Sequence, residues 1–380
     1  MKYKVAGIVF EVRLEEPYRE MEYSPVVLDR IARASRGEAG LDIRPTRAGD
    51  DVPHRTLVQT REELLPGARG LDLSQYAPFQ LDRDFSASVE MTEKQSVEMT
   101  EDQPGDCVPR RNRPHFTDGE GYSLPAFVLT VKRGLDKAPE LGTLITRVQT
   151  QLPYFSIYEH EGCPRYTLDE NTETGEPSAI LCMSPDFKES ELYVAESLRA
   201  SAVVFQLSTA LMMNFTYVSA QKGVLLIHAS VIGYNGKANI FLGKSGTGKS
   251  THSRLWLENI PGADLLNDDN PALGFDKDGK PCIFGTPWSG KTPCYRNICA
   301  PLNAIVRLEQ APENSIARDS GINAFAALYG SVSAIRWNRP IMDAITASVE
   351  KIASSVKVFR LSCLPDPAAA QLCCRTILEL

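Results

Sequence analysis

The sequence predicts an α/β protein built from two domains. A smaller β-rich domain is expected over residues 1–185, and an α/β domain with a mixed sheet over residues 186–380. Three observations predict this. Short strand-like runs between Gly, Pro and Asn turns fill the first part of the chain, and strand-like and helix-like patterns alternate in the second. A tight turn also joins two apolar strands directly before a glycine-rich loop.

The tight turn is Asn235-Gly236, a strong short-range signal for a β-hairpin. It separates an apolar run at 224–231 from a second run at 237–242. Strands joined by two residues are antiparallel, whereas a purely parallel sheet would need a crossover connection at this point. The sequence therefore predicts a mixed sheet in the second domain.

The other elements follow from local patterns. In the first domain the strand-like runs are 3–12, 54–59, 124–132, 143–149, 155–158 and 178–183. The longest helical pattern, at 189–220, has a broad apolar face and should be a buried helix, or pair of helices, that bridges the two domains. In the second domain, strands are predicted at 304–308 and 356–361, and helices at 322–328, 342–353 and 366–380.

A flexible insertion is predicted at about 86–121. The hexapeptide Ser-Val-Glu-Met-Thr-Glu occurs at 88–93 and again at 96–101. Residues 104–121 then combine Pro, Gly, Asp, Arg and Asn with few apolar side chains, a composition that does not support a packed core. A tolerated surface insertion and a recognition segment are the two interpretations of this stretch.

Composition excludes several classes of function. The chain has 380 residues with 43% hydrophobic and 23% charged residues, as in ordinary globular proteins. Its net charge of −7, without a basic block, gives no electrostatic support for nucleic-acid binding. We expect no membrane span and no signal peptide. Nine irregularly spaced cysteines favour buried thiols in a reducing, cytoplasmic environment over a zinc site.

The glycine-rich loop at 243–250 fits the pattern G-x-x-x-x-G-K-[ST] in full and lies between a predicted strand and a predicted helix. Glycines let backbone N–H groups turn inward around phosphate oxygens, and the helix directs its positive end at the same anion. Lys249 is expected to reach the β- and γ-phosphates, and Ser250 to offer its hydroxyl to Mg²⁺. The predicted nucleotide-binding residues are Gly243, Ser245, Gly246, Thr247, Gly248, Lys249, Ser250 and Thr251.

Two adjacent acids, Asp268 and Asp269, follow a short predicted strand, 19 and 20 residues after Lys249. Ligands bind at such strand ends in α/β sheets. One acid can hold Mg²⁺, and the other can accept a proton from an attacking hydroxyl. His228 lies on the first strand of the hairpin, and the hairpin should return it toward the loop and the acids. A satisfied core histidine is the alternative for His228 and the expectation for His252.

A second loop at 284–293 contains Lys291. This side chain, or that of Arg296, could neutralise the charge that develops on a transferred phosphoryl group. The alternative is that both are solvated surface cations.

Segments 226–230, 243–251, 265–270 and 285–288, together with the hairpin, resemble the catalytic domain of HPr kinase/phosphorylase. That domain is related to the nucleotide-binding domain of phosphoenolpyruvate carboxykinase. The resemblance covers roughly residues 190 to 380 and implies a mixed-sheet P-loop kinase fold. It implies ATP- and Mg²⁺-dependent transfer of the γ-phosphate to a hydroxyl group of a protein, peptide or small molecule. A serine hydroxyl is the favoured acceptor.

The resemblance also implies roles for single residues. Lys249 binds the phosphates, Ser250 and Asp269 serve Mg²⁺, and Asp268 is the base, although the two acids can exchange roles. His228 matches a catalytic position near the metal and the acids. The resemblance raises the expectation of a homo-oligomer.

Two alternatives stay open. A carboxykinase-like enzyme would need arginines that bind the substrate carboxylates, and the sequence does not identify them. A nucleotide-binding regulatory protein without turnover would have no need of the intact lysine, serine and acid pair. The first domain does not resemble that of HPr kinase, and the C-terminal signature that contacts HPr is not found. The sequence therefore leaves the acceptor, and a phosphorylase reaction, undetermined.

Overall fold

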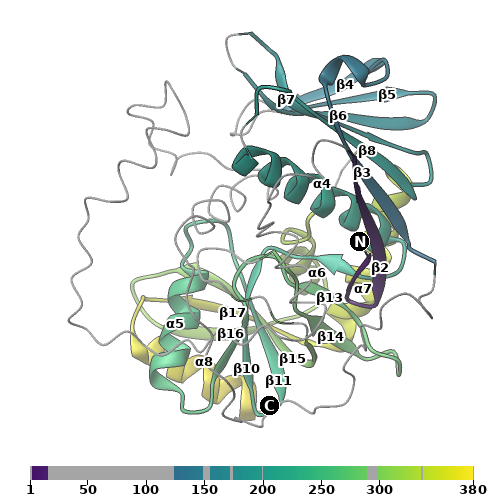
Figure 1. Ribbon diagram of the computed structural model, residues 1–380. Helices are drawn as coiled ribbons and strands as arrows, with labels where there is room; N and C mark the ends of the chain where they lie inside the picture. Colours follow the sequence, from purple (N-terminus) through teal and green to yellow (C-terminus); the bar gives the residue numbers. More distant parts are fainter. Residues whose placement is uncertain are drawn as a thin grey trace, which may run out of the picture.

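The structure is a computed structural model that describes residues 2–15, 124–148, 155–171, 174–198, 200–288, 294, 296, 298–334 and 337–379. The predicted insertion at 86–121 lies outside the described residues, and so does Lys291. Within the described residues, the chain forms two mixed sheets with helices between and around them (Figure 1). The predicted α/β fold class with a mixed sheet is confirmed at this level.

The first sheet has eight strands in the order β1-β2-β3-β8-β7-β6-β5-β4. Strand β3 pairs in parallel with both β2 and β8, and the other pairs are antiparallel. Its strands are β1 Lys2–Val5, β2 Ile8–Leu14, β3 Phe127–Arg133, β4 Thr143–Val148, β5 Phe155–His160, β6 Cys163–Glu170, β7 Pro177–Met183 and β8 Glu189–Val194, with a short 3-10 helix η2 at Leu135–Lys137.

Strand β8 corrects one sequence prediction. The helical pattern was expected to begin at residue 189, but residues 189–194 form a strand between β3 and β7. Pairing on both sides outweighs local helix preference here, because it satisfies every backbone group of a central strand. The domain boundary expected at 185/186 stays a prediction, although the first sheet itself continues to Val194.

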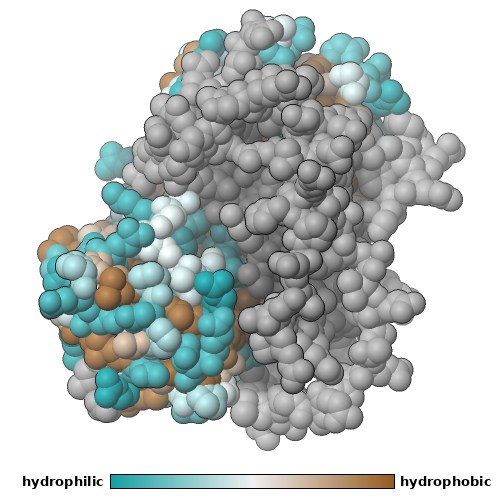
Figure 2. Space-filling model, turned by 90° about the vertical axis from the view of Figure 1, so that its left-hand side faces the viewer, coloured by the Kyte–Doolittle hydropathy of each residue, from teal (hydrophilic) through white to brown (hydrophobic). Residues whose placement is uncertain are grey.

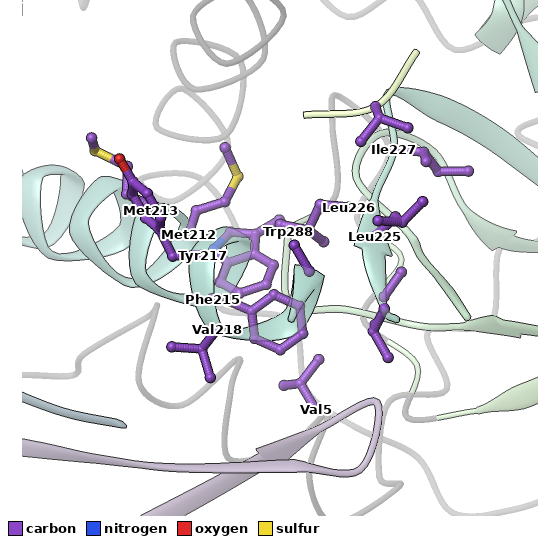
Figure 3. Close-up of a cluster of buried hydrophobic side chains, with 14 of the residues drawn as sticks. Val5, Met212, Met213, Phe215, Tyr217, Val218, Leu225, Leu226, Ile227 and Trp288 are labelled. Carbon is purple, nitrogen blue, oxygen red and sulfur yellow. The ribbon is translucent and has the colours of Figure 1, made fainter. Parts of the chain in front are cut away.

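Helix α4 (Ala200–Ala220) lies between the two sheets (Figure 1). Its apolar side chains belong to one continuous core with residues of both sheets. Figure 3 shows part of this core, where Met212 and Phe215 of α4 lie near Trp288, and Val218 and Leu225 belong to the same cluster. The rings of Phe215 and Trp288 are 5.3 Å apart between centroids. The predicted buried, bridging helix is therefore present.

Among the described residues, α4 is also long and apolar enough to cross a membrane by length and composition alone. However, 72% of that apolar window is buried inside the protein. Because its apolar faces are covered by the two sheets, α4 is accounted for as a core helix.

The second sheet has nine strands. Seven follow the order β12-β10-β11-β15-β14-β13-β9, with β17 next to β15 and β16 next to β17. Strand β15 pairs in parallel with β11 and β17 and antiparallel with β14, which makes the sheet mixed. Its strands are β9 Leu225–Leu226, β10 Ala229–Tyr234, β11 Lys237–Leu242, β12 Asp264–Asn267, β13 Ala272–Phe275, β14 Pro281–Phe284, β15 Cys299–Gln310, β16 Ser315–Asp319 and β17 Lys357–Cys363.

The predicted hairpin joins β10 to β11. Asn235 and Gly236 both have positive φ, 51° and 73°, as a two-residue turn of this type requires. Strand β11 is therefore antiparallel to the strand before it and parallel to β15. This arrangement is the mixed sheet that the sequence predicted.

Among the described residues, four helices complete the second part: α5 Lys249–Asn259, α6 Ile322–Tyr329, α7 Arg339–Ser355 and α8 Pro367–Glu379. Helices α5 and α8 cover one face of the second sheet with a separate core that includes Phe241, Trp256 and Phe359. Helices α6 and α7 join the core of the other face, together with α4. On the side shown in Figure 2, hydrophilic and hydrophobic residues are interspersed over the described surface.

We expect Phe215→Ala to lower the free energy of unfolding by about 3–5 kcal/mol, because Phe215 is fully buried where α4 meets the second sheet. Urea denaturation would measure the change. Ile322→Ala, at a position that is 75% exposed, is the control and should change stability by less than about 0.5 kcal/mol. Equal losses in the two variants would contradict the central role of this core.

Candidate functional site

Strand order brings the predicted site residues to one edge of the second sheet. Strand β10 lies between β11 and β12 and is antiparallel to both. The C-terminal ends of β11 and β12 therefore flank the N-terminal end of β10. In register, Leu242 pairs with Ala229, and Asn267 pairs with Val231. The loop at 243–250, the acid pair and residues 228–230 consequently leave the sheet from three adjacent strands.

The glycine-rich loop follows β11 and ends at the start of α5. Gly246 and Gly248 have φ of 80° and 109°, where side chains are rarely tolerated. Gly248 is the N-terminal capping residue of α5, so the unpaired N–H groups of the first turn and the positive end of the helix lie at the loop. Ser245 and Ser250 are exposed there.

Lys249 lies beneath this loop rather than in solvent. The residue is 9% exposed, and its Nζ donates a hydrogen bond of 3.1 Å to the carbonyl of Gly243. Gly243 is tightly surrounded, because a Cβ at this position would come within 3.1 Å of the Thr247 side chain. The loop thus holds the buried lysine by a hydrogen bond from its ammonium group to the first carbonyl of the loop.

Gln310 supports the loop from the neighbouring strand, a role that the sequence did not reveal. Its Nε2 donates a hydrogen bond of 3.2 Å to the carbonyl of Gly246. Gln310 is the last residue of β15, which runs parallel to β11. In a parallel pair, the two C-terminal ends lie side by side, so the contact depends on strand order and not on sequence spacing.

The two acids are buried and contact different partners. Asp268 and Asp269 are 7% and 4% exposed. Oδ1 of Asp268 accepts a hydrogen bond of 2.7 Å from Ser230 of β10, and Ser230 Oγ lies 2.6 Å from Ser253 Oγ of α5. Oδ1 of Asp269 lies 3.6 Å from Nδ1 of His228. Both acids lie in a bend directly after β12, and the two neighbouring side chains face different groups there.

His228 occupies a break between two strands. The hairpin strand was expected to be continuous from 224 to 231, but β9 ends at Leu226 and β10 begins at Ala229. The break is where the chain stops pairing with β13 and starts pairing with β11 and β12. The His228 amide donates to the carbonyl of Ser331 (2.8 Å), which fixes this residue beside Asp269.

The backbone of the acid pair is held from two sides. The amide of Asp269 donates to Oδ1 of Asn267 (2.9 Å), and its carbonyl accepts from the amide of Ala229 (2.9 Å). Thr286 Oγ1 donates to the carbonyl of Asn270 (2.6 Å) and accepts from the amide of Trp288 (3.2 Å). The segment 286–288 therefore clamps the turn that follows the acids.

His252 is a structural residue, as predicted. It accepts a hydrogen bond of 3.1 Å from the indole N–H of Trp256, and its ring lies edge-on to Phe241. Burial lowers the pKa of His252 to about 4, so the imidazole is neutral and acts as an acceptor. The histidine completes the apolar core under α5.

Two cations, Lys291 in the second loop and Arg296 shortly after it, were candidates to neutralise phosphoryl charge. Lys291 lies outside the described residues, so its predicted role stays untested. Arg296 forms an ion pair with Asp264 of β12 and donates to the carbonyl of Leu265 (2.9 Å). Cys294 is buried and donates to the same carbonyl, and burial raises the pKa of its thiol to about 12. This thiol fits the expectation of buried, unreactive cysteines.

Within the described ranges, no three His, Cys, Asp or Glu side chains gather closely enough to hold a metal by themselves. The oxygen donors at this end of the sheet include the Ser250 hydroxyl and the carboxylates of Asp268 and Asp269. Hard oxygen donors of this kind suit Mg²⁺, which usually takes one or two protein ligands together with phosphate oxygens and water. The chemistry of these donors is compatible with Mg²⁺.

Comparisons with known proteins do not assign this chain to a family. No family model matches the sequence. No curated protein matches it. Among solved structures, the chain is similar to the HPr(Ser) kinase/phosphatase from Coxiella burnetii, with a TM-score of 0.25 and 10% sequence identity over 40% of this chain and 97% of that chain. A likeness of this size indicates at most a distant relationship and carries no argument about function.

Gly248→Ala is expected to weaken pyrophosphate binding by at least about tenfold, because a side chain disfavours the backbone conformation that directs the loop amides at an anion. Isothermal titration calorimetry would measure the affinity. Gly279→Ala is the matched control. Gly279 also has a positive φ, 75°, with no atom near its would-be Cβ, but it lies in the turn between β13 and β14.

The free energy of unfolding should fall by a similar amount, about 1–2 kcal/mol, in both glycine variants. Loss of pyrophosphate binding in both, or in neither, would count against an anion site in the loop.

Proposed function

We propose that this protein is an ATP- and Mg²⁺-dependent kinase that transfers the γ-phosphate to a hydroxyl group of a protein, peptide or small molecule, with a serine hydroxyl as the favoured acceptor. One observation carries the proposal. The buried acid Asp268 is joined through Ser230 to Ser253 on the helix that begins in the glycine-rich loop. The expected phosphate-binding element and the expected proton acceptor are thus hydrogen-bonded parts of one unit.

The loop supplies the binding of the nucleotide. Its amides and the positive end of α5 would hold the β- and γ-phosphates, with the buried ammonium of Lys249 next to them. Gln310 would keep the loop in shape through the carbonyl of Gly246. Ser250 and Asp269 would hold Mg²⁺, which when bound neutralises phosphate charge in the transition state.

The acid pair supplies the chemistry on the acceptor. The acceptor oxygen attacks the γ-phosphorus, the bond from that phosphorus to the bridging oxygen breaks, and ADP leaves with the electron pair. Asp268 takes the proton of the acceptor hydroxyl. His228, 3.6 Å from Asp269, would orient the second carboxylate. Burial of both acids strengthens each of these electrostatic interactions.

The first sheet and α4 lie outside this unit, and we assign acceptor recognition to that part of the chain. A cytoplasmic location and a homo-oligomeric state belong to the same proposal and come from the sequence alone. Because no described contact identifies the acceptor, the first experiment has to search among acceptor classes.

The protein would be incubated with γ-labelled ATP and Mg²⁺, alone and with serine, serine peptides, HPr or oxaloacetate. We expect label on one hydroxyl acceptor, and loss of that label in Lys249→Ala. Formation of phosphoenolpyruvate from oxaloacetate would replace this function with a carboxykinase. Tight ATP binding without transfer to any acceptor would favour a regulatory nucleotide-binding protein.

Asp268→Asn should lower kcat by about 10²–10⁴-fold with little change in nucleotide affinity, because an amide cannot accept the acceptor's proton. Asp269→Asn should instead raise the Mg²⁺ concentration needed for half-maximal rate. Asp343→Asn, at an exposed site on α7, is the control and should match the wild type. If Asp269→Asn lowers kcat and Asp268→Asn raises the Mg²⁺ requirement, the roles of the two acids are exchanged. If neither variant has an effect, both roles are refuted.

A further inference from the structure

Ser230 places a hydroxyl where the sheet pattern calls for an apolar side chain. It is 1% exposed, and Ile232, two residues along the same face of β10, packs in the core beneath α5 and α8. Its partner in register on β11 is Phe241, which belongs to the same core. A buried hydroxyl costs free energy unless it is hydrogen-bonded, so the contacts of Ser230 need an explanation.

Counting protons fixes the direction of those contacts. Ser230 Oγ lies 2.7 Å from Oδ1 of Asp268 and 2.6 Å from Oγ of Ser253. An ionised carboxylate can only accept, so Ser230 donates its single proton to Asp268. Ser230 therefore has no proton left for Ser253, and Ser253 must donate to Ser230. The hydrogen bonds run in one direction, from Ser253 through Ser230 to Asp268.

The first donor in this series of hydrogen bonds, Ser253, lies on the helix that follows the phosphate loop. Ser253 is 2% exposed and lies on α5, three residues after Ser250. Residues three apart on a helix lie on the same side, so Ser253 sits one turn beyond the loop. Two short hydrogen bonds therefore connect α5, one turn after the loop, to Asp268.

We propose that Ser230 and Ser253 form a positioning relay, which sets the orientation of the Asp268 carboxylate relative to the phosphate loop. The inference rests on the proposed function and adds two residues to it. Neither serine would touch the reacting atoms. Their contribution would be to keep the proton acceptor in line with the nucleotide, where an error of about 1 Å can cost about 10²-fold in rate.

The test is a double-mutant cycle with Ser230→Ala, Ser253→Ala and the double variant. We expect Ser230→Ala to lower kcat by about 10- to 100-fold and Ser253→Ala by about 3- to 10-fold. The double variant should be no slower than Ser230→Ala, because Ser253 acts through Ser230. Nucleotide Kd, measured by calorimetry, should stay within about twofold in all three variants.

Two comparisons separate positioning from a general loss of structure. Ser348→Ala removes a buried hydroxyl of α7 that donates to the Ala344 carbonyl (2.9 Å), and it should leave kcat unchanged. Ser230→Thr keeps the donor on a β-branched residue suited to a strand, and it should recover most of the lost kcat. Urea denaturation of every variant checks the fold. It also tests the Ser253–Ser230 hydrogen bond without an activity assay, because the losses of unfolding free energy in the two alanine variants should not add up in the double variant.

Several results would overturn the relay. One is a kcat of Ser230→Ala within twofold of the wild type, and another is a double variant whose loss of kcat equals the product of the two single losses. A loss of kcat that parallels a loss of nucleotide affinity would also contradict the relay, and so would additive losses of unfolding free energy in the denaturation cycle. If the wild type transfers phosphate to no acceptor, the proposed kinase function fails instead. In that case the denaturation cycle alone decides whether the two serines are coupled.

Discussion

The position of β10 between β11 and β12 is the constraint on which the site depends. Because β10 is antiparallel to both neighbours, the phosphate loop and the acid pair leave the sheet on either side of the same strand end. Neighbouring strands are about 4.8 Å apart, so the two elements are separated by about 10 Å. Ser230 at the N-terminal end of β10, and His228 directly before that strand, lie in this interval. With a different strand order, every sequence motif would still be present, but the motifs would no longer lie next to one another.

Burial of the acid pair requires the polar contacts around it. A carboxylate removed from water is costly unless donors or opposite charges surround it. The serine hydroxyl on Asp268 and the imidazole near Asp269 are such partners, and backbone hydrogen bonds fix the turn itself. Both side-chain partners come from β10 and the link between β9 and β10, and they are held in turn by Ser253 of α5 and the carbonyl of Ser331 after α6. Burial of the acids therefore depends on segments that are far apart in the sequence.

The core around α4 makes the two sheets interdependent. Residues of both sheets belong to one cluster with α4, whereas α5 and α8 form a separate core on the far face of the second sheet. Tyr217 of α4 is hydrogen-bonded to Tyr166 of the first sheet, and the Trp337 indole donates to Tyr166 (3.3 Å). The part of the chain proposed to recognise the acceptor is therefore packed against the part proposed to bind the nucleotide.

The sequence by itself determined the elements whose signals are local. The hairpin at Asn235-Gly236, the glycine loop between strand and helix, and most strands and helices of the second part follow from turn chemistry and periodicity. Tertiary structure decided what depends on pairing between distant segments. It made residues 189–194 a strand, broke the hairpin strand at His228, and placed Ser230, Ser253 and Gln310 at the site. Serine and glutamine carry no spacing signal of their own, because their roles arise only when strand order brings them to the loop and the acids.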